Sequence, residues 1–82
     1  MKIVAVVEDD SDQRENYADV LAAQGYEIQE YGSKPEAQAG FQKSLPDLAI
    51  LDIMLGEDMD GGFELCMELR NMSPHLPVIF LT

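Results

Sequence analysis

The hydrophobic positions of this chain fall into two patterns that alternate along its length. Short runs of aliphatic and β-branched residues, typical of buried strands, alternate with longer stretches whose apolar residues have helical spacing. The alternation predicts an α/β fold with a parallel sheet. The predicted strands are Ile3 to Val7, Tyr26 to Tyr31, Leu48 to Leu51 and Val78 to Thr82, and the predicted helices run from about Asp12 to Gln24, from Ser33 to about Lys43 and from about Gly62 to Asn71.

The polarity of each strand predicts its place in the sheet. Ile3 to Val7 and Leu48 to Leu51 are apolar at every position, as strands must be when helices cover both of their faces. Tyr26 to Tyr31 instead alternates apolar with polar residues, so one of its faces meets water. We therefore expect this second strand at a margin of the sheet.

Capping residues and apolar spacing define the helices further. We expect Ser11 to cap the first helix and Gly25 to end it in a left-handed conformation. Ser33 and Glu36 form a capping-box pattern at the start of the second helix. Helical spacing also assigns an inward side to the first and third helices, with the single cysteine in the core. These predicted inward residues are Tyr17, Val20, Leu21 and Gln24, and Phe63, Cys66, Met67 and Arg70.

Composition and charge narrow the classes of function. The 82 residues carry sixteen acidic and five basic side chains, and the formal net charge of −11 repels nucleic-acid phosphates and anionic membranes. We therefore expect no direct contact with nucleic acid or with a membrane. No apolar run is long enough for a membrane span, and the single cysteine cannot form an internal disulfide. These features predict one small cytoplasmic domain.

Acidic residues follow two of the apolar strands at the point where each strand ends. Glu8 and Asp9 come directly after the first strand, and Asp52 closes the third. Ligands of open parallel sheets bind beyond the carboxyl ends of the strands. If the first and third strands are neighbours, these three carboxylates lie within reach of one another. Without a cation, repulsion between the like charges makes it unfavourable for all three to ionise. Hard oxygen ligands without His or Cys favour Mg²⁺ or Mn²⁺, and the alternative is three solvated carboxylates.

Three segments resemble the signature segments of the response-regulator receiver domain of two-component signalling. They are Ile3 to Asp10, Leu48 to Leu55 and Pro77 to Thr82, so the resemblance extends over the whole chain. It implies a flavodoxin-like receiver fold, with three layers and a doubly wound parallel sheet of strand order 2-1-3-4. Shorter segments resemble, more narrowly, the response regulator of the proteobacterial dedicated sortase system: Arg14 to Tyr17, Leu45 to Leu48 and Asp60 to Cys66.

The resemblance also implies roles for particular residues. Asp52 would be the phosphoacceptor, and Glu8, Asp9, Asp52 and the backbone carbonyl of Met54 would bind Mg²⁺. Thr82 would supply the switch hydroxyl that donates to the phosphoryl oxygens. A sensor histidine kinase would be the phosphodonor, and an output domain absent from this chain, usually DNA-binding in the family, would regulate transcription. The protein would then be a signalling acceptor and not an enzyme.

The chain departs from the family pattern in three respects. It lacks the fourth helix, the fifth strand with its phosphate-pairing lysine and the fifth helix, so we interpret residues 1–82 as the N-terminal part of a receiver domain and expect weaker phosphorylation. Gly56 stands where the family usually has proline, and the loop before Gly61 is one residue longer. Without a fifth strand, Val78 to Leu81 would form an unpaired apolar edge, and we expect self-association through it.

The same residues bear on three other possible functions. A receiver-like fold can dock a partner without any phosphorylation, which the absent lysine favours and the complete set of acids disfavours. A phosphohydrolase that uses Asp52 as nucleophile would need a second aspartate two residues later, where Met54 stands. A calcium loop at Asp58 and Asp60 lacks the EF-hand spacing.

Overall fold

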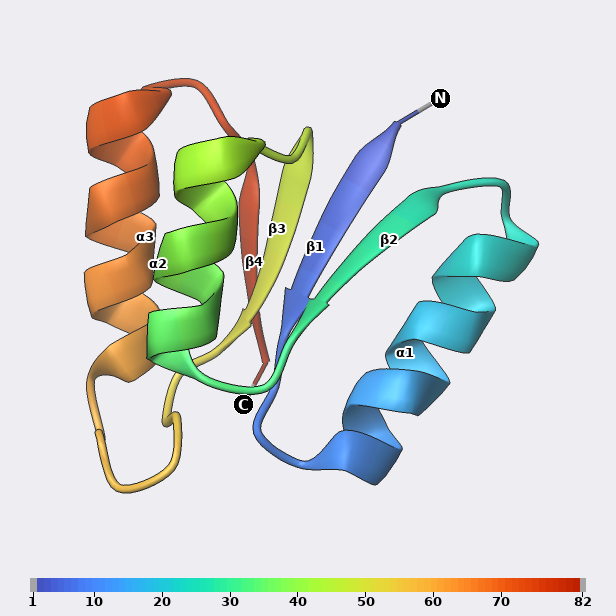
Figure 1. Ribbon diagram of the computed structural model, residues 1–82, viewed down its shortest axis with the longest axis horizontal. Helices are drawn as coiled ribbons and strands as arrows, with labels where there is room; N and C mark the ends of the chain where they lie inside the picture. The colour runs from blue at the N-terminus through green and yellow to red at the C-terminus, as the bar shows by residue number, and fades with distance from the viewer. Residues whose placement is uncertain (1, 82) are drawn as a thin grey trace.

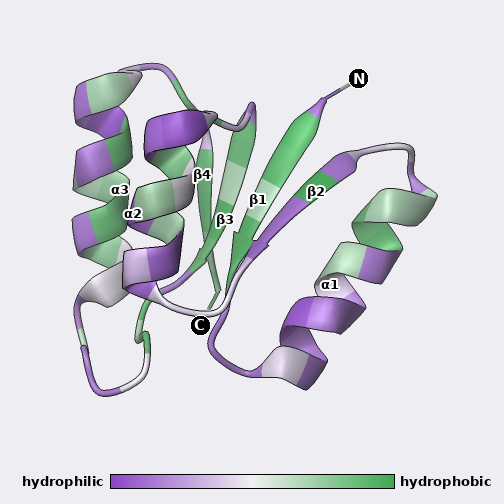
Figure 2. Cartoon of the chain, viewed as in Figure 1, coloured by the Kyte–Doolittle hydropathy of each residue, from purple (hydrophilic) through white to green (hydrophobic). Residues whose placement is uncertain are grey.

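The computed structural model, which describes residues 2–81, contains a parallel sheet with strand order β2-β1-β3-β4 (Figure 1). Its strands are β1 (Ile3–Val7), β2 (Glu27–Tyr31), β3 (Leu48–Asp52) and β4 (Val78–Leu81). The predicted strand order and the marginal position of β2 are confirmed. Figure 2 shows the reason, because β2 is largely hydrophilic whereas the neighbouring β1 is hydrophobic along its length.

Helices cover both faces of the sheet and give the predicted three layers. Helix α1 (Ser11–Ala23) lies on one face, and α2 (Lys34–Lys43) and α3 (Gly61–Met72) lie side by side on the other (Figure 1). Within residues 2–81, no helix has both the length and the apolar character that crossing a bilayer requires. The cytoplasmic location stays a prediction.

The sheet divides the interior into two clusters of unequal size. The larger cluster lies under α2 and α3 and includes Val7, Phe41 and Leu65. The smaller lies under α1, where Val4 and Val6 are buried among partly covered side chains. Successive residues of β1 point to opposite faces, so this one strand contributes to both clusters. That double burial explains why β1 has no polar position.

The helix ends agree with the sequence prediction except at the start of α1. Asp10, not Ser11, is the N-cap: its Oδ1 accepts hydrogen bonds from the backbone N–H groups of Asp12 at 3.0 Å and Gln13 at 3.1 Å. An aspartate caps as well as a serine and adds a negative charge at the positive end of the helix dipole. Gly25 follows the helix with φ +96°, as predicted.

The second helix has the predicted serine cap. The Ser33 hydroxyl accepts a hydrogen bond from the N–H of Glu36 at 3.3 Å. The Glu36 carboxylate reaches one residue further back than a capping box requires, to the N–H of Gly32 at 2.7 Å. The second hydrogen bond of the capping box is therefore made by the N–H of Gly32 in place of the N–H of Ser33.

The predicted inward side of α3 is wrong. The helix buries Leu65 and Leu69, whereas Phe63 and Met67 are 45% and 68% exposed, and Cys66 lies at the boundary of the core. The two sets of residues have equally good helical spacing, so periodicity alone could not separate them. The two glycines that begin the helix decide between them, because they lie on the leucine side and let the backbone approach the sheet closely.

The inward side of α1 is also only partly as predicted. Ala18 is the buried residue of this helix and Leu21 packs on the smaller cluster, but Val20 is 64% exposed. A small residue at position 18 lets α1 approach the sheet, and Val20 then points away.

Strand β4 lies at the margin opposite β2. It pairs with β3, and within the described residues no strand lies along its other side. Ile79 on this strand is half exposed. Self-association through this edge stays a prediction.

Candidate functional site

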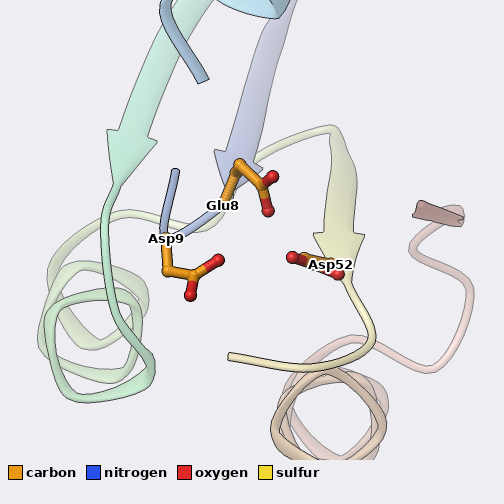
Figure 3. A group of neighbouring side chains, drawn as sticks. All are labelled: Glu8, Asp9 and Asp52. Atoms are coloured by element: carbon orange, nitrogen blue, oxygen red, sulfur yellow. The ribbon is translucent and has the colours of Figure 1, made fainter. Parts of the chain in front are cut away.

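Three carboxylates meet at the carboxyl ends of β1 and β3, and we call Glu8, Asp9 and Asp52 the acidic rim. The strands are neighbours in a register that pairs Val7 with Leu51, so the next residues of the two strands also lie side by side. One oxygen from each of the three side chains lies within 4.8 Å of the others. Figure 3 shows the three side chains pointing toward a common space. Tertiary pairing thus brings together the residues that the sequence predicted as ligands.

Glu8 is the least accessible member of the acidic rim. It is only 4% exposed, and its Oε2 atom has no hydrogen-bond partner in the described part of the chain. Burial, followed by a hydrogen bond to Asp52 and the charges of Asp52, Asp9 and Asp10, raises the pKa of the Glu8 carboxyl from 4.5 to about 8. A protonated Glu8 can donate to Asp52, whereas an ionised Glu8 carboxylate faces the like charges of Asp52, Asp9 and Asp10. The ionised form therefore needs a cation.

This arrangement fits a divalent cation with hard oxygen ligands. Within the described residues, the acidic rim is the group of three acids whose oxygens converge, and no His or Cys belongs to it. A cation near Oε2 would supply the missing partner of that buried oxygen and would reverse the repulsion among the carboxylates. The chemistry of the ligands favours Mg²⁺ or Mn²⁺ over Zn²⁺.

Backbone contacts hold the ends of β1 and β3 in place. The Arg14 guanidinium donates from Nη1 to the Glu8 carbonyl oxygen at 2.8 Å, which ties α1 to the residue after β1. The N–H of Gly62 donates to the carbonyl oxygen of Ile53 at 2.9 Å. A Cβ atom at Gly62 would overlap the backbone carbonyl of Asp52, so α3 can begin against this loop only with a glycine there.

Neither Arg14 nor Gly62 was predicted to shape the site. The Gly61-Gly62 pair directly before a helical pattern was the available signal for a close backbone approach. Arg14 carried no such signal, because its contact with Glu8 depends on how α1 turns back along the sheet.

A cavity of about 490 Å³ opens over the acidic rim. Its lining extends along α1, through Gln13 and Tyr17, and Leu81 of β4 closes another side. The cavity is large enough to admit a phosphoryl donor group beside the three carboxylates. Its position beyond the carboxyl ends of the strands is where open parallel sheets bind their ligands.

The remaining predicted site residues have different outcomes. Met54 follows Asp52 by two residues and its side chain is half exposed; the role of its carbonyl as a ligand stays a prediction. Thr82, the predicted switch hydroxyl, lies outside the described residues. Asp58 accepts hydrogen bonds from Lys34 Nζ at 3.5 Å and from the N–H of Asp60 at 3.2 Å. These contacts give the loop acids a structural role and do not favour a calcium site.

Residues 4–82 match the family model described as the response regulator receiver domain. The chain belongs to this receiver domain family. Among curated relatives, this receiver domain is 35% identical over 82 residues to the sensory transduction protein RegX3 of Mycolicibacterium smegmatis. It is 40% identical over 81 residues to the phosphate regulon transcriptional regulatory protein PhoB of Rhizobium meliloti. The matches cover 100% and 96% of this chain, but only 35% of each relative.

Solved receiver structures show the same fold. The non-phosphorylated receiver domain of HemR from Leptospira biflexa superposes with a TM-score of 0.89 and 27% identity, covering 100% of this chain and 64% of that one. NtrX from Brucella abortus superposes with a TM-score of 0.88 and 30% identity, covering 96% of this chain and 18% of that one. The predicted receiver fold and family are therefore confirmed. The narrower resemblance to the dedicated sortase system regulator stays a prediction.

Proposed function

We propose that this receiver domain accepts a phosphoryl group on Asp52 in a two-component phosphorelay. The observation that carries the proposal is the convergence of Glu8, Asp9 and Asp52, with a buried Glu8 oxygen that lacks a partner. Three ionised carboxylates at this spacing have no structural benefit without a cation. Their position at the open end of the sheet gives a donor group access to Asp52.

Glu8, Asp9 and Asp52 would hold Mg²⁺, together with the backbone carbonyl of Met54. The bound ion neutralises charge between the carboxylate and the incoming phosphoryl group. The protein's own contribution is to keep the three acids in position and to exclude water from Glu8. Loss of the proton from Glu8 would accompany binding, since its pKa is about 8 in the ion-free fold.

Asp52 would act as the nucleophile. One of its carboxylate oxygens forms a bond to phosphorus while the bond from phosphorus to the donor atom breaks, and the departing donor group keeps the bonding electrons. A phosphohistidine of a sensor kinase fits the donor role, because its departing nitrogen can take up a proton. The acyl phosphate then presents acceptor oxygens, to which the Thr82 hydroxyl would donate its hydrogen.

The partners follow from this chemistry and from the relatives. A histidine kinase would supply the phosphoryl group, and a DNA-binding output region would respond, which agrees with the transcriptional regulatory role in the name of PhoB and the sensory transduction role in the name of RegX3. The receiver is chemically altered in each cycle, so we propose that it is a signalling acceptor and not a turnover enzyme.

A receiver-like docking module without phosphorylation is the second candidate. Exposed apolar side chains on α3, including Phe63 and Met67, are compatible with such docking. Docking alone, however, would leave the unpartnered oxygen of Glu8 unexplained. A titration with Mg²⁺ followed by NMR separates the two candidates, because a docking module has no reason to bind the ion at Glu8 and Asp52.

Labelling of the chain with a small phosphodonor tests the proposal. With acetyl phosphate and Mg²⁺, the intact mass should rise by one phosphoryl group, and omission of Mg²⁺ or the Asp52→Asn substitution should abolish the rise. Asp60→Asn, which removes an exposed acid of the same loop outside the acidic rim, is the matched control and should be labelled like wild type. Equal labelling of the Asp52→Asn variant would overturn the assignment.

A further inference from the structure

The loop between β3 and α3 contacts the acidic rim through one backbone group. The N–H of Gly56 donates a hydrogen bond to Oδ2 of Asp9 at 3.0 Å, although the two residues are 47 positions apart in the chain. The bond joins the segment after β3 to the segment after β1. A carboxylate has lone pairs for about four partners, so Asp9 can accept this bond and still bind a cation.

Gly56 makes this bond from a backbone conformation that few residues adopt. Its φ is +63°, in the left-handed region that glycine enters without penalty. A Cβ atom at this position would meet no other atom within 4 Å, so the requirement is conformational and not steric. Proline can neither adopt this φ nor donate an N–H.

The rest of the loop holds Gly56 in place. Leu55 and Asp58 exchange two backbone hydrogen bonds of 3.0 Å each, which close a tight turn around Gly56 and Glu57. The Leu55 side chain is 5% exposed and belongs to the larger core cluster. At the other end of the turn, the Asp58 carboxylate lies 3.5 Å from Lys34 Nζ, which also pairs with Glu64 at 3.0 Å. The turn is thus anchored to the core, to α2 and to α3.

We propose that Gly56 is a positioning residue for the cation site, and that its amide holds the Asp9 carboxylate toward Glu8 and Asp52 before a cation binds. The inference rests on the proposed function of that site. Asp9 is exposed, and its side chain would otherwise sample several rotamers. Fixing it in advance removes part of the ordering cost of binding. Groups that orient a metal ligand typically change affinity by about 10–100-fold.

Three variants separate the hydrogen bond from the loop's general stability. Gly56→Pro removes the N–H and excludes a positive φ, whereas the conservative Gly56→Asn keeps the N–H and tolerates the left-handed region. Gly25→Pro is the matched control. Gly25 also has a positive φ, +96°, and its N–H donates to the Ala22 carbonyl at 3.0 Å, but it follows the C-terminal end of α1, whereas Asp9 precedes the N-terminal end.

Hydrogen exchange tests the bond without any metal. In the metal-free protein, the Gly56 amide should exchange about tenfold faster in Asp9→Ala than in wild type, while the amides of β1 keep their wild-type rates. If the Gly56 amide exchanges equally fast in the two proteins, the bond does not hold in solution and the proposal is overturned, whether or not the site binds a cation.

Calorimetric titration with MgCl₂ tests the consequence. Gly56→Pro should raise the Kd for Mg²⁺ by about tenfold. This is the lower end of the usual range, because Asp9 is only one of the three acids that would hold the ion. Gly56→Asn should restore most of the affinity, and Gly25→Pro should bind within about twofold of wild type. Unchanged affinity in Gly56→Pro would overturn the positioning role. Wild type that binds no Mg²⁺ would overturn the proposed function, a result that the exchange experiment distinguishes from loss of the bond alone.

Discussion

Glu8 in the acidic rim and Leu65 in the larger core cluster are nearly equal in burial, with exposed fractions of 4% and 0%. Leu65 is surrounded by apolar side chains from α2, α3 and the sheet, so the removal of its surface from water stabilises the fold. Glu8 is surrounded by acids, and its Oε2 has no partner in the described residues. The same degree of burial therefore has opposite effects on the free energy of folding.

The comparison shows how this small fold holds mutually repelling carboxylates together at the carboxyl ends of its strands. The core under α2 and α3 anchors β1 and β3, and the ends of those strands then carry the carboxylates into proximity. Repulsion among the carboxylates is tolerated because the strands cannot separate without opening the core. A cation would convert that repulsion into binding energy. Variants in the core and variants at the acidic rim should therefore affect the protein differently.

The largest effect is expected from a cavity in the core. Leu65→Ala should lower the free energy of unfolding by about 2–5 kcal/mol, because its neighbours cannot fill the space fully. Urea unfolding followed by circular dichroism measures this change. Met67→Ala in the same helix is the control and should change stability by no more than about 0.5 kcal/mol, since Met67 is 68% exposed. Equal losses in the two variants would show that α3 faces the sheet differently.

A smaller effect is expected where the core meets the acidic rim. Gly62→Ala should lower the free energy of unfolding by about 1–3 kcal/mol, because the new Cβ atom would overlap the Asp52 carbonyl. The higher helix propensity of alanine opposes this loss by about 1 kcal/mol. Gly61→Ala, whose Cβ would lie 3.0 Å from the Leu55 side chain, should cost less. A Gly62→Ala variant more stable than wild type would contradict the close approach.

The most specific effect, and the smallest one per pH unit, is a dependence of stability on pH. The pKa of Glu8 is about 8 in the fold against 4.5 ordinarily, so between these values the folded state binds more protons than the unfolded state. Stability without metal should therefore fall as pH rises from 4.5 to 8, by at most about 1.4 kcal/mol per pH unit for this group. Thermal unfolding at several pH values measures the slope.

Two comparisons make the pH experiment specific. Glu8→Gln should flatten the profile, and millimolar Mg²⁺ should raise the melting temperature of wild type at pH 7 through preferential binding to the native state. A Glu8→Gln profile parallel to that of wild type would contradict the raised pKa. A melting temperature indifferent to Mg²⁺ would count against the cation site.

Local sequence patterns determined most of the elements and the candidate ligands. Uniform apolarity of Ile3 to Val7 and alternation before Tyr31 predicted a central and a marginal strand, because strand burial depends on which faces are covered. Glu8, Asp9 and Asp52 were found from their positions at strand ends. Their closeness was conditional on the pairing of β1 with β3, which the resemblance to receiver domains implied and the sheet confirms.

Where the sequence offered two equally good local alternatives, only the tertiary structure decided between them. Asp10 and Ser11 are both good caps, and two sides of α3 have the same spacing, so local energies do not separate them. The burial of Glu8 and the bond from Gly56 to Asp9 depend on packing between segments distant in the chain. Electrostatic repulsion and hydrogen bonding depend on distances of a few ångströms in space. The number of residues between two groups in the chain does not determine that distance.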